Sequence, residues 1–139
     1  MKRHYLLSLF LLVSVLTMAQ KPIAKFTETT HDFGVISGDK KEVSTKFEFT
    51  NTGQAPLLIT NVTASCGCTT PKWNKAPVPP GGKGVIIVGF KPKGSVGFVE
   101  KTITVTNNSP ENKIVLKIKG EVLPKDKKDK KDKNEKKTN

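Results

Sequence analysis

Arginine is almost absent from this sequence, and aromatic residues are scarce. Arg3 is the only arginine among 24 basic residues, although the 139-residue chain carries a formal net charge of +12. Proteins that read phosphate groups or guanine edges prefer the planar, bidentate guanidinium group. Aromatic residues make up 6% of the chain and do not alternate with basic ones, as they do in proteins that bind single strands. Specific nucleic-acid binding is therefore not expected.

Histidine and helix signals are also scarce. His31 is the only histidine after the first nineteen residues, and no glycine-rich loop opens a helix. A nucleophilic triad needs a general base, and this part of the chain offers one histidine, flanked by Asp32. Acidic residues such as Glu48 and Glu100 fall on outward strand positions, whereas glycoside hydrolysis needs two facing carboxylates. The sequence predicts a protein that is not an enzyme, and it gives no reason to expect a cofactor.

Residues 1–19 are typical of a signal peptide. Lys2 and Arg3 precede an apolar run over 5–18, and small residues stand at the −3 and −1 positions for a cut after Ala19. The run is shorter than the ~20 residues that span a membrane. We therefore expect cleavage, no transmembrane span afterwards, and a protein that is periplasmic, on the cell surface or secreted. Such compartments allow disulfides.

Residues 20–124 are predicted to form one all-β domain. Apolar and polar residues alternate along 43–51 and 113–123, which is the period of a half-buried strand. Further strands are expected over 21–26, 31–36, 57–64, 84–91 and 98–107, with a brief one near 69–73. The run over 84–91 is nearly all apolar and is expected to be central and buried on both faces. About seven strands with short turns predict an immunoglobulin-like antiparallel two-sheet sandwich.

Residues 125–139 form a tail of different composition. Eight lysines stand against four acidic residues, and no side chain is apolar. Because such a segment buries nothing, we expect it to be disordered. It is either a solvated tail or an electrostatic tether to phosphate-rich lipid headgroups or polyanionic glycans.

Cys66 and Cys68 are the only two cysteines, and Gly67 separates them. Three interpretations are open: a local disulfide or packed thiols that fix the loop, a thiol site for a soft metal such as Cu(I), and a redox site. Zinc normally takes four ligands, and only His31 is available besides the cysteines. A redox site normally has two intervening residues and a group that stabilises the thiolate. The structural interpretation is therefore preferred.

Trp73 is the only tryptophan and lies in the proline-rich stretch over 65–82. It is expected either to cover the end of the core or to contact a partner. Lys72 and Lys75 beside it indicate that this stretch reaches water at least in part. All three residues are candidate partner contacts.

Five short motifs suggest a family. They are His31-Asp32-Phe33-Gly34, Phe49-Thr50-Asn51-Thr52-Gly53, Ser65-Cys66-Gly67-Cys68-Thr69, Pro80-Gly81 and Lys119-Gly120-Glu121-Val122. Together they resemble the bacterial family of domains of unknown function numbered 1573, over about 26–122. The resemblance implies an immunoglobulin-like sandwich related to the major sperm protein and pilus-chaperone folds. It also implies an exported protein of Gram-negative bacteria, most often Bacteroidota, and it brings no catalytic residues.

These observations favour an exported, non-catalytic interaction module of the cell envelope, either an adaptor or a structural component. Its expected partner is another envelope protein or a polyanionic surface, and small sandwiches can recruit a partner by adding a strand at a sheet edge. The alternative is a thiol-based copper-binding or redox protein that acts through Cys66 and Cys68.

Overall fold

The computed structural model describes residues 20–125, and the statements below refer to these residues. The predicted signal peptide (1–19) and nearly all of the predicted tail (126–139) lie outside them. The described chain forms eight strands and no helix. The strands are β1 (Ala24–Phe26), β2 (Thr30–Ser37), β3 (Val43–Asn51), β4 (Ile59–Ala64), β5 (Thr69–Trp73), β6 (Lys83–Phe90), β7 (Gly97–Asn107) and β8 (Lys113–Leu123).

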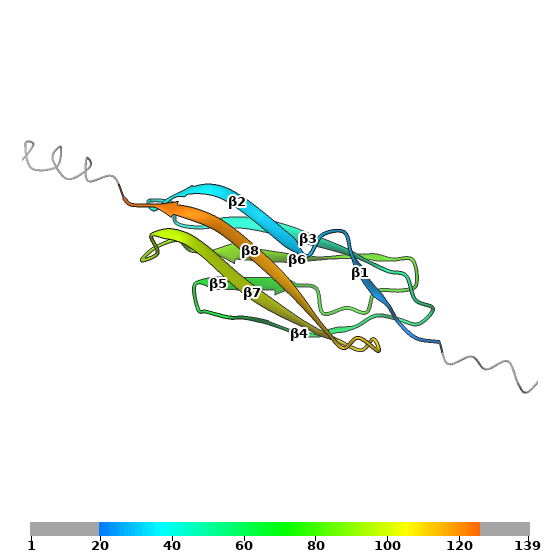
Figure 1. Ribbon diagram of the computed structural model, residues 1–139. Helices are drawn as coiled ribbons and strands as arrows, with labels where there is room; N and C mark the ends of the chain where they lie inside the picture. Colours follow the sequence, from blue (N-terminus) through cyan, green and yellow to red (C-terminus); the bar gives the residue numbers. More distant parts are fainter. Residues whose placement is uncertain (1–19, 126–139) are drawn as a thin grey trace, which may run out of the picture.

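The eight strands form two sheets of four. Sheet A has the order β1-β3-β6-β5, and sheet B has the order β2-β8-β7-β4. Figure 1 shows the two sheets stacked as layers with their strands along the long axis of the molecule. Neighbouring strands are antiparallel except β2 and β8, which run parallel. The predicted all-β immunoglobulin-like sandwich is thus confirmed, with eight strands and one parallel pair.

The core lies between the sheets and is built by period-two alternation. On β3, Phe47 and Phe49 are buried while Lys46 and Glu48 are exposed. Because successive side chains of a strand point to opposite faces, one face of each sheet becomes apolar. The buried apolar residues are Ile36, Phe47, Phe49, Leu57, Ile59, Val62, Ile86, Val88, Phe90, Ile103, Val105, Leu116, Ile118 and Val122.

The prediction that the apolar run over 84–91 is buried on both faces is wrong. β6 does lie inside sheet A, between β3 and β5. Ile86 and Val88 are fully buried, but Val85 and Ile87 point outward and are each 37% exposed. Among the described residues, no layer covers the outer face of sheet A, so alternate residues of the strand contact water. β-Branched residues suit a pleated surface even when it is only half covered.

Two strands begin more than one residue away from their predicted starts. The first strand begins at Ala24 instead of residue 21, and the fourth begins at Ile59 instead of residue 57. Leu57 is nevertheless fully buried and pairs with Val78 in an isolated antiparallel bridge. The brief strand expected near 69–73 is present as β5.

Connections gather at the two ends of the sandwich (Figure 1). The cysteine end holds the turns over 38–42 and 65–68, the loop over 91–96 and the chain over 123–125. These segments touch: the Lys91 N–H donates to the Cys68 carbonyl at 2.8 Å. A Cβ added at Gly38 would also meet the backbone of Leu123.

The opposite end, here called the proline end, holds the turn over 52–58, the loop over 74–82 and the turn over 108–112 (Figure 1).

Candidate functional site

Trp73 ends β5 and lies at the edge of both sheets. Its side chain is half-buried and packs against the core. The indole Nε1–H donates to the carbonyl of Ile59 on β4 at 3.3 Å. Because β4 belongs to sheet B and β5 to sheet A, this bond joins the two sheets. Trp73 therefore covers part of the core while the rest of its surface stays accessible.

The loop over 74–82 follows Trp73 and is fixed by a local turn, by Leu57 and, at Gly81 and Gly82, by backbone hydrogen bonds with Asn51. Asn74 Oδ1 accepts a hydrogen bond from the Ala76 N–H at 2.9 Å, which forms a local turn. Val78 exchanges two backbone hydrogen bonds with Leu57, at 2.7 and 2.8 Å. Pro77 and Pro79 restrict the backbone on either side of Val78. The loop thus has few free backbone torsions between its points of attachment.

Asn51 is the residue that sequence reasoning missed. Its side chain is fully buried and makes four hydrogen bonds. Nδ2 donates to the carbonyls of Ala55 and Val78, and Oδ1 accepts from the N–H groups of Gly53 and Ile23. The amide therefore ties β1, the turn over 52–58 and the proline-rich loop together. The Asn-Thr-Gly motif was visible in the sequence, but it suggested only a turn.

Close backbone contacts explain why the third residue of the Asn-Thr-Gly motif, Gly53, is a glycine. A Cβ at this position would collide with the backbone of Lys21, Pro22 and Ile23. The chain before β1 runs so close to the turn that only glycine fits.

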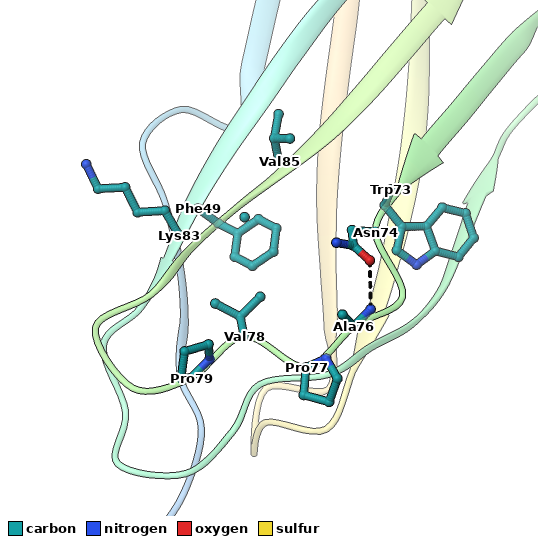
Figure 2. A pocket seen from close by; sticks show the side chains of 10 residues that line it. Phe49, Trp73, Asn74, Ala76, Pro77, Val78, Pro79, Lys83 and Val85 are labelled. Carbon is teal, nitrogen blue, oxygen red and sulfur yellow. Dashed lines mark hydrogen bonds between the residues drawn. The ribbon is translucent and has the colours of Figure 1, made fainter.

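A cavity of about 150 Å³ opens beside Trp73. Figure 2 shows the proline-rich loop with the Phe49 ring and the side chain of Val78 close together, while the Trp73 ring lies beyond Asn74 and Ala76 and points away from them. Gly84 lies against the Phe49 ring, and a Cβ there would overlap the ring. The remaining lining residues are Asn74, Ala76, Pro77, Pro79, Lys83 and Val85. The cavity is largely apolar and open to solvent.

The two lysines predicted beside Trp73 are both exposed. Lys72 is on β5, opposite Ile87 of β6, and Lys75 is in the loop. Lys83, which lines the cavity, is exposed as well. Among the described residues, the lysines found in ion pairs are Lys117 and Lys119. Lys83 at the cavity, and Lys72 and Lys75 on either side of Trp73 and Asn74 in the chain, thus lie outside the ion pairs of the described residues.

Cys66 and Cys68 form a disulfide with a Cα–Cα distance of 5.3 Å. They lie in the short connection that carries the chain from β4 in sheet B to β5 in sheet A. Both residues are half-buried, and the hydroxyl of the buried Thr69 lies 3.6 Å from the Cys66 sulfur. In this bonded state neither sulfur is the thiolate that copper binding requires, and the thiol-based alternative stays a prediction.

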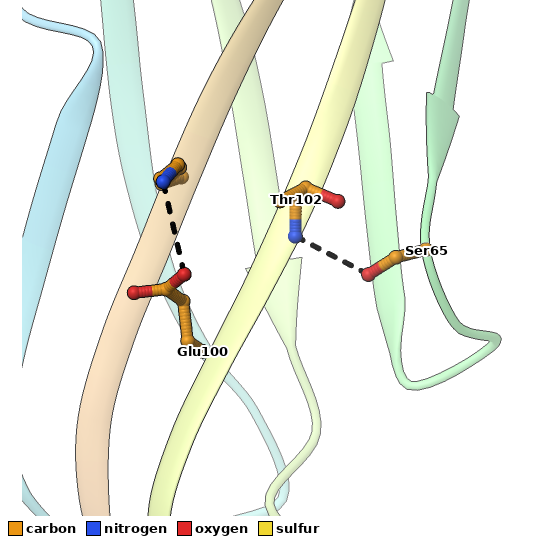
Figure 3. Close-up of polar contacts among 4 residues, drawn as sticks. Ser65, Glu100 and Thr102 are labelled. Atoms are coloured by element: carbon orange, nitrogen blue, oxygen red, sulfur yellow. Dashed lines mark hydrogen bonds and ion pairs between the residues drawn. The ribbon is translucent and has the colours of Figure 1, made fainter.

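Backbone contacts hold this connection to both sheets. The Ser65 N–H donates to the Thr102 carbonyl at 2.9 Å, and the Thr102 N–H donates to Ser65 Oγ at 3.2 Å. Figure 3 shows the second of these bonds. On the sheet A side, the Cys68 carbonyl accepts from Lys91. The crossing is thus anchored at both ends.

His31 lies far from the cysteines. It is on β2, at one edge of sheet B, whereas Cys66 follows β4 at the other edge. Its Nδ1 is 3.4 Å from a carboxylate oxygen of Glu28, and its ring meets the Phe33 ring edge-on at 4.8 Å. Within residues 20–125, no group of three or more histidine, cysteine or acidic residues is placed to hold a metal ion.

The remaining residues of the His-Asp-Phe-Gly motif form a bulge on β2. Gly34 has a φ of 63°, and the register with β8 shifts between Asp32 and Val35. The Asp32 carboxylate accepts the Gly34 N–H at 2.8 Å and lies 3.4 Å from Lys119 Nζ. The Gly34 hydrogen bond and the lysine charge lower the pKa of Asp32 below its ordinary value.

The arrangement of the strands gives the structural class of the protein, and the family follows from a match to its sequence. Two four-stranded sheets that enclose one core, with no helix among the described residues, make the chain an immunoglobulin-like sandwich of the PapD-like kind. The chain belongs to the DUF1573 family of proteins of unknown function, whose model matches residues 24–122.

Solved structures support the fold. A protein of unknown function from Porphyromonas gingivalis W83 is 23% identical with a TM-score of 0.66; the match covers 77% of this chain and 50% of that one. The ASH / PapD-like domain 7 of human CEP192 is 9% identical with a TM-score of 0.60, covering 76% and 89%. This chain thus spans half the length of the Porphyromonas protein. No curated protein matches it.

Some similar structures are parts of enzymes. A family 123 glycoside hydrolase from Clostridium perfringens is 12% identical with a TM-score of 0.59, but the match covers only 27% of that chain. At this identity the likeness shows the fold alone and transfers no activity. In the described part of the chain, no helix is long and apolar enough to cross a membrane.

Proposed function

We propose that this protein is an exported, non-catalytic interaction module of the bacterial cell envelope, and that it binds a segment of another envelope protein at the Trp73 cavity. The observation that carries the proposal is the cavity itself, which is open to solvent and lined by two aromatic residues, two prolines and two valines. Binding sites in proteins are typically preformed, mostly apolar depressions with a few polar groups.

The fixed loop supports a binding role because a rigid site loses little entropy when it is occupied. Asn51 and Leu57 hold Val78 from two directions, and prolines flank it. Each flexible side chain or loop that must be ordered on binding costs about 0.5–1.5 kcal/mol. The Trp73 cavity avoids most of that cost.

The charges around the cavity indicate the chemistry of the partner segment. Lys72, Lys75 and Lys83 are exposed close to it and lie outside the ion pairs of the described residues. Complementary charge speeds association and selects partners. The partner segment is therefore an apolar side chain flanked by aspartate or glutamate.

Strand addition at the edge of β5, the other mode expected from the fold, is less favourable. The Cys68 carbonyl faces β6, where it accepts from Lys91. Because backbone groups of a strand alternate in direction, Thr70 and Lys72 also face β6, and Pro71 faces the open edge. Proline has no N–H to donate, and proline on an edge strand blocks pairing with another chain.

Site-specific photo-crosslinking tests the interaction. A photoreactive residue in place of Lys75 is expected to form an adduct with one envelope protein in intact cells. Ala76→Leu, which fills the cavity from its exposed wall, should remove the adduct while leaving the melting temperature unchanged. The matched control is the same photoreactive residue in place of Asn112, at the same end but on the other sheet. Equal adducts from both positions, or an adduct that Ala76→Leu leaves intact, would refute the proposal.

Export is tested separately on the protein isolated from its own cells. The n-region and the apolar run of residues 1–19 support cleavage after Ala19. We expect an envelope protein whose first residue is Gln20. A cytoplasmic protein that retains Met1 would contradict this part of the proposal without affecting the crosslinking result.

A further inference from the structure

We propose that the cysteine end of the sandwich docks on the surface of an anionic phospholipid bilayer. The observation behind this proposal is a cluster of exposed apolar side chains, here called the apolar tip, formed by Val35, Val96, Phe98 and Leu123. The apolar tip and the Trp73 cavity lie at opposite ends of the molecule (Figure 1). The two proposals are therefore independent.

Strand register places the apolar tip on the outer face of sheet B. Val35 of β2 and Phe98 of β7 both pair with Glu121 of β8, so the three residues form one row across the sheet. Leu123 lies two residues further along β8, on the same face and nearer the end. Val96 immediately precedes β7. The next residue along each strand points to the opposite face of sheet B, so Ile36 and Val122 are buried in the core.

The apolar tip is unusually exposed. Phe98, Val96 and Val35 retain 72%, 68% and 65% of their surface, and Leu123 retains 45%. Single exposed apolar residues are normal, but a group at one place indicates a contact surface. Sequence position gave no hint of the group, because it comes from three strands that are distant along the chain.

The outer face of sheet B becomes charged away from this end. The next positions toward the middle carry the ion pairs of Asp32 with Lys119 and of Glu100 with Lys117, at 3.4 and 3.8 Å; Figure 3 shows the Glu100 carboxylate over the sheet. Apart from Val115 toward the proline end, the large exposed apolar side chains of this face thus gather at the cysteine end of the sandwich. This shape suits shallow insertion of a tip into the boundary of a bilayer rather than packing of the whole face.

Around the apolar tip, the exposed lysines outnumber the exposed acidic residues Asp39, Glu42 and Glu121. Every connection at this end except the turn that carries the disulfide contributes at least one exposed lysine: Lys40 and Lys41, Lys91 and Lys93, and Lys125. The sequence that follows, 126–139, adds seven lysines against four acidic residues. A lysine close to an anionic membrane surface contributes about 1 kcal/mol of attraction. A cluster of exposed apolar side chains with an excess of lysines around it matches a bilayer that carries anionic headgroups.

Glu121 argues against a second copy of this chain as the occupant. It lies between Val35 and Phe98, so a two-fold contact centred on this row would bring two carboxylates together in an apolar interface. Burying like charges without partners is strongly unfavourable. At a bilayer surface, the Glu121 carboxylate would stay at the level of the hydrated headgroups. Its charge should weaken binding to anionic lipid but should not prevent it.

Vesicle flotation tests the proposal with residues 20–139, which contain every strand and the whole core. The probes are vesicles of phosphatidylcholine alone and of phosphatidylcholine with one-third phosphatidylglycerol. We expect binding to the anionic vesicles only, weakened by salt. Val96→Ser with Phe98→Ser should lower the partition coefficient by roughly tenfold or more. Val115→Ser, on the same face but toward the proline end, should leave it unchanged.

Charge variants sharpen the test. Lys93→Glu should weaken binding to the anionic vesicles by about fivefold or more, and Glu121→Gln should strengthen it. The melting temperatures of all variants should stay close to that of the wild type, because the substituted side chains are exposed. Binding that is equal for wild type and the double serine variant would mean that the tail alone binds, and would overturn the proposal.

Two other outcomes would also overturn it. One is a protein that floats with neither vesicle. The other is a protein that forms a dimer in sedimentation equilibrium which the double serine variant abolishes, since the apolar tip would then be occupied by a second copy.

Discussion

Asn51 offers the sharpest test of how the proline end is built. Replacing it with alanine removes four side-chain hydrogen bonds that join segments up to 28 residues apart. A net hydrogen bond contributes about 1 kcal/mol to stability, and more where a buried partner is left unpaired. Asn51→Ala should therefore lower the free energy of unfolding by about 4 kcal/mol, a large fraction of the 5–15 kcal/mol typical of a domain.

Asn107 supplies a matched control. It is also a buried asparagine at the end of a strand, but its side chain makes only two hydrogen bonds, with Ser109 and Glu111, both within one turn. Asn107→Ala should cost about 2 kcal/mol. With about 5 °C per kcal/mol for a domain of this size, thermal unfolding followed by circular dichroism should show shifts of roughly 20 and 10 °C. An Asn51 variant no less stable than the Asn107 variant would refute the reasoning.

Asn51→Asp separates hydrogen bonding from packing. The new carboxylate would face the carbonyl oxygens of Ala55 and Val78, which now accept from Nδ2. Burial and these oxygens should raise the pKa of the introduced carboxyl above its unfolded value. The variant should then be most stable below about pH 4 and lose stability as pH rises through the raised pKa. Denaturant unfolding at several pH values should show this trend for Asn51→Asp and not for Asn51→Ala.

Three further predictions concern other parts of the fold. Thiol titration of freshly isolated protein should find no free thiol, whereas two rapidly reacting thiols would favour the copper or redox alternative. Replacing Cys66 and Cys68 with serine should lower the free energy of unfolding by only about 1.5 kcal/mol, because the loop that the disulfide closes is short. Gly84→Ala should lower the free energy of unfolding by about 1–3 kcal/mol, since the added Cβ would overlap a buried phenylalanine ring. Gly67→Ala should leave it nearly unchanged in the same assay, because the space around Gly67 is open. In the wild type, the lowered pKa of the Asp32 carboxyl stabilises the fold above the pKa that this carboxyl has in the unfolded chain, and the stabilisation is lost as pH falls through the lowered pKa. Asp32→Asn should remove this contribution. The free energies of unfolding of the two proteins should therefore converge at low pH and differ near neutrality.

Strand positions could be predicted closely from the sequence because burial alternates locally. The ranges expected for 43–51 and 113–123 are those of β3 and β8, and the brief strand at 69–73 is β5. Period-two alternation is a property of neighbouring residues, so it needs no knowledge of the partner strand. For the two cysteines, a structural role was preferred because the sequence offers too few ligands for zinc and lacks the spacing of a redox site.

Only part of the candidate site could be predicted from the sequence. Trp73 and its lysines could be singled out by residue type, but Asn51 could not, because its partners Ile23 and Val78 are 28 and 27 residues away. An asparagine in a turn motif has the same local signature whether it serves one turn or holds three segments together.

The stretches that become strands, and the side of each strand that is apolar, could be inferred from the order of residues because both depend on near neighbours in the chain. Only the tertiary structure decided which strands pair, and hence that β2 runs parallel to β8 and that the outward side chains of β6 contact water. The same pairing brought Val35 and Phe98 to either side of Glu121. Alternation specifies a face of a strand, but neighbours across a sheet are chosen by packing between residues that are far apart in the chain.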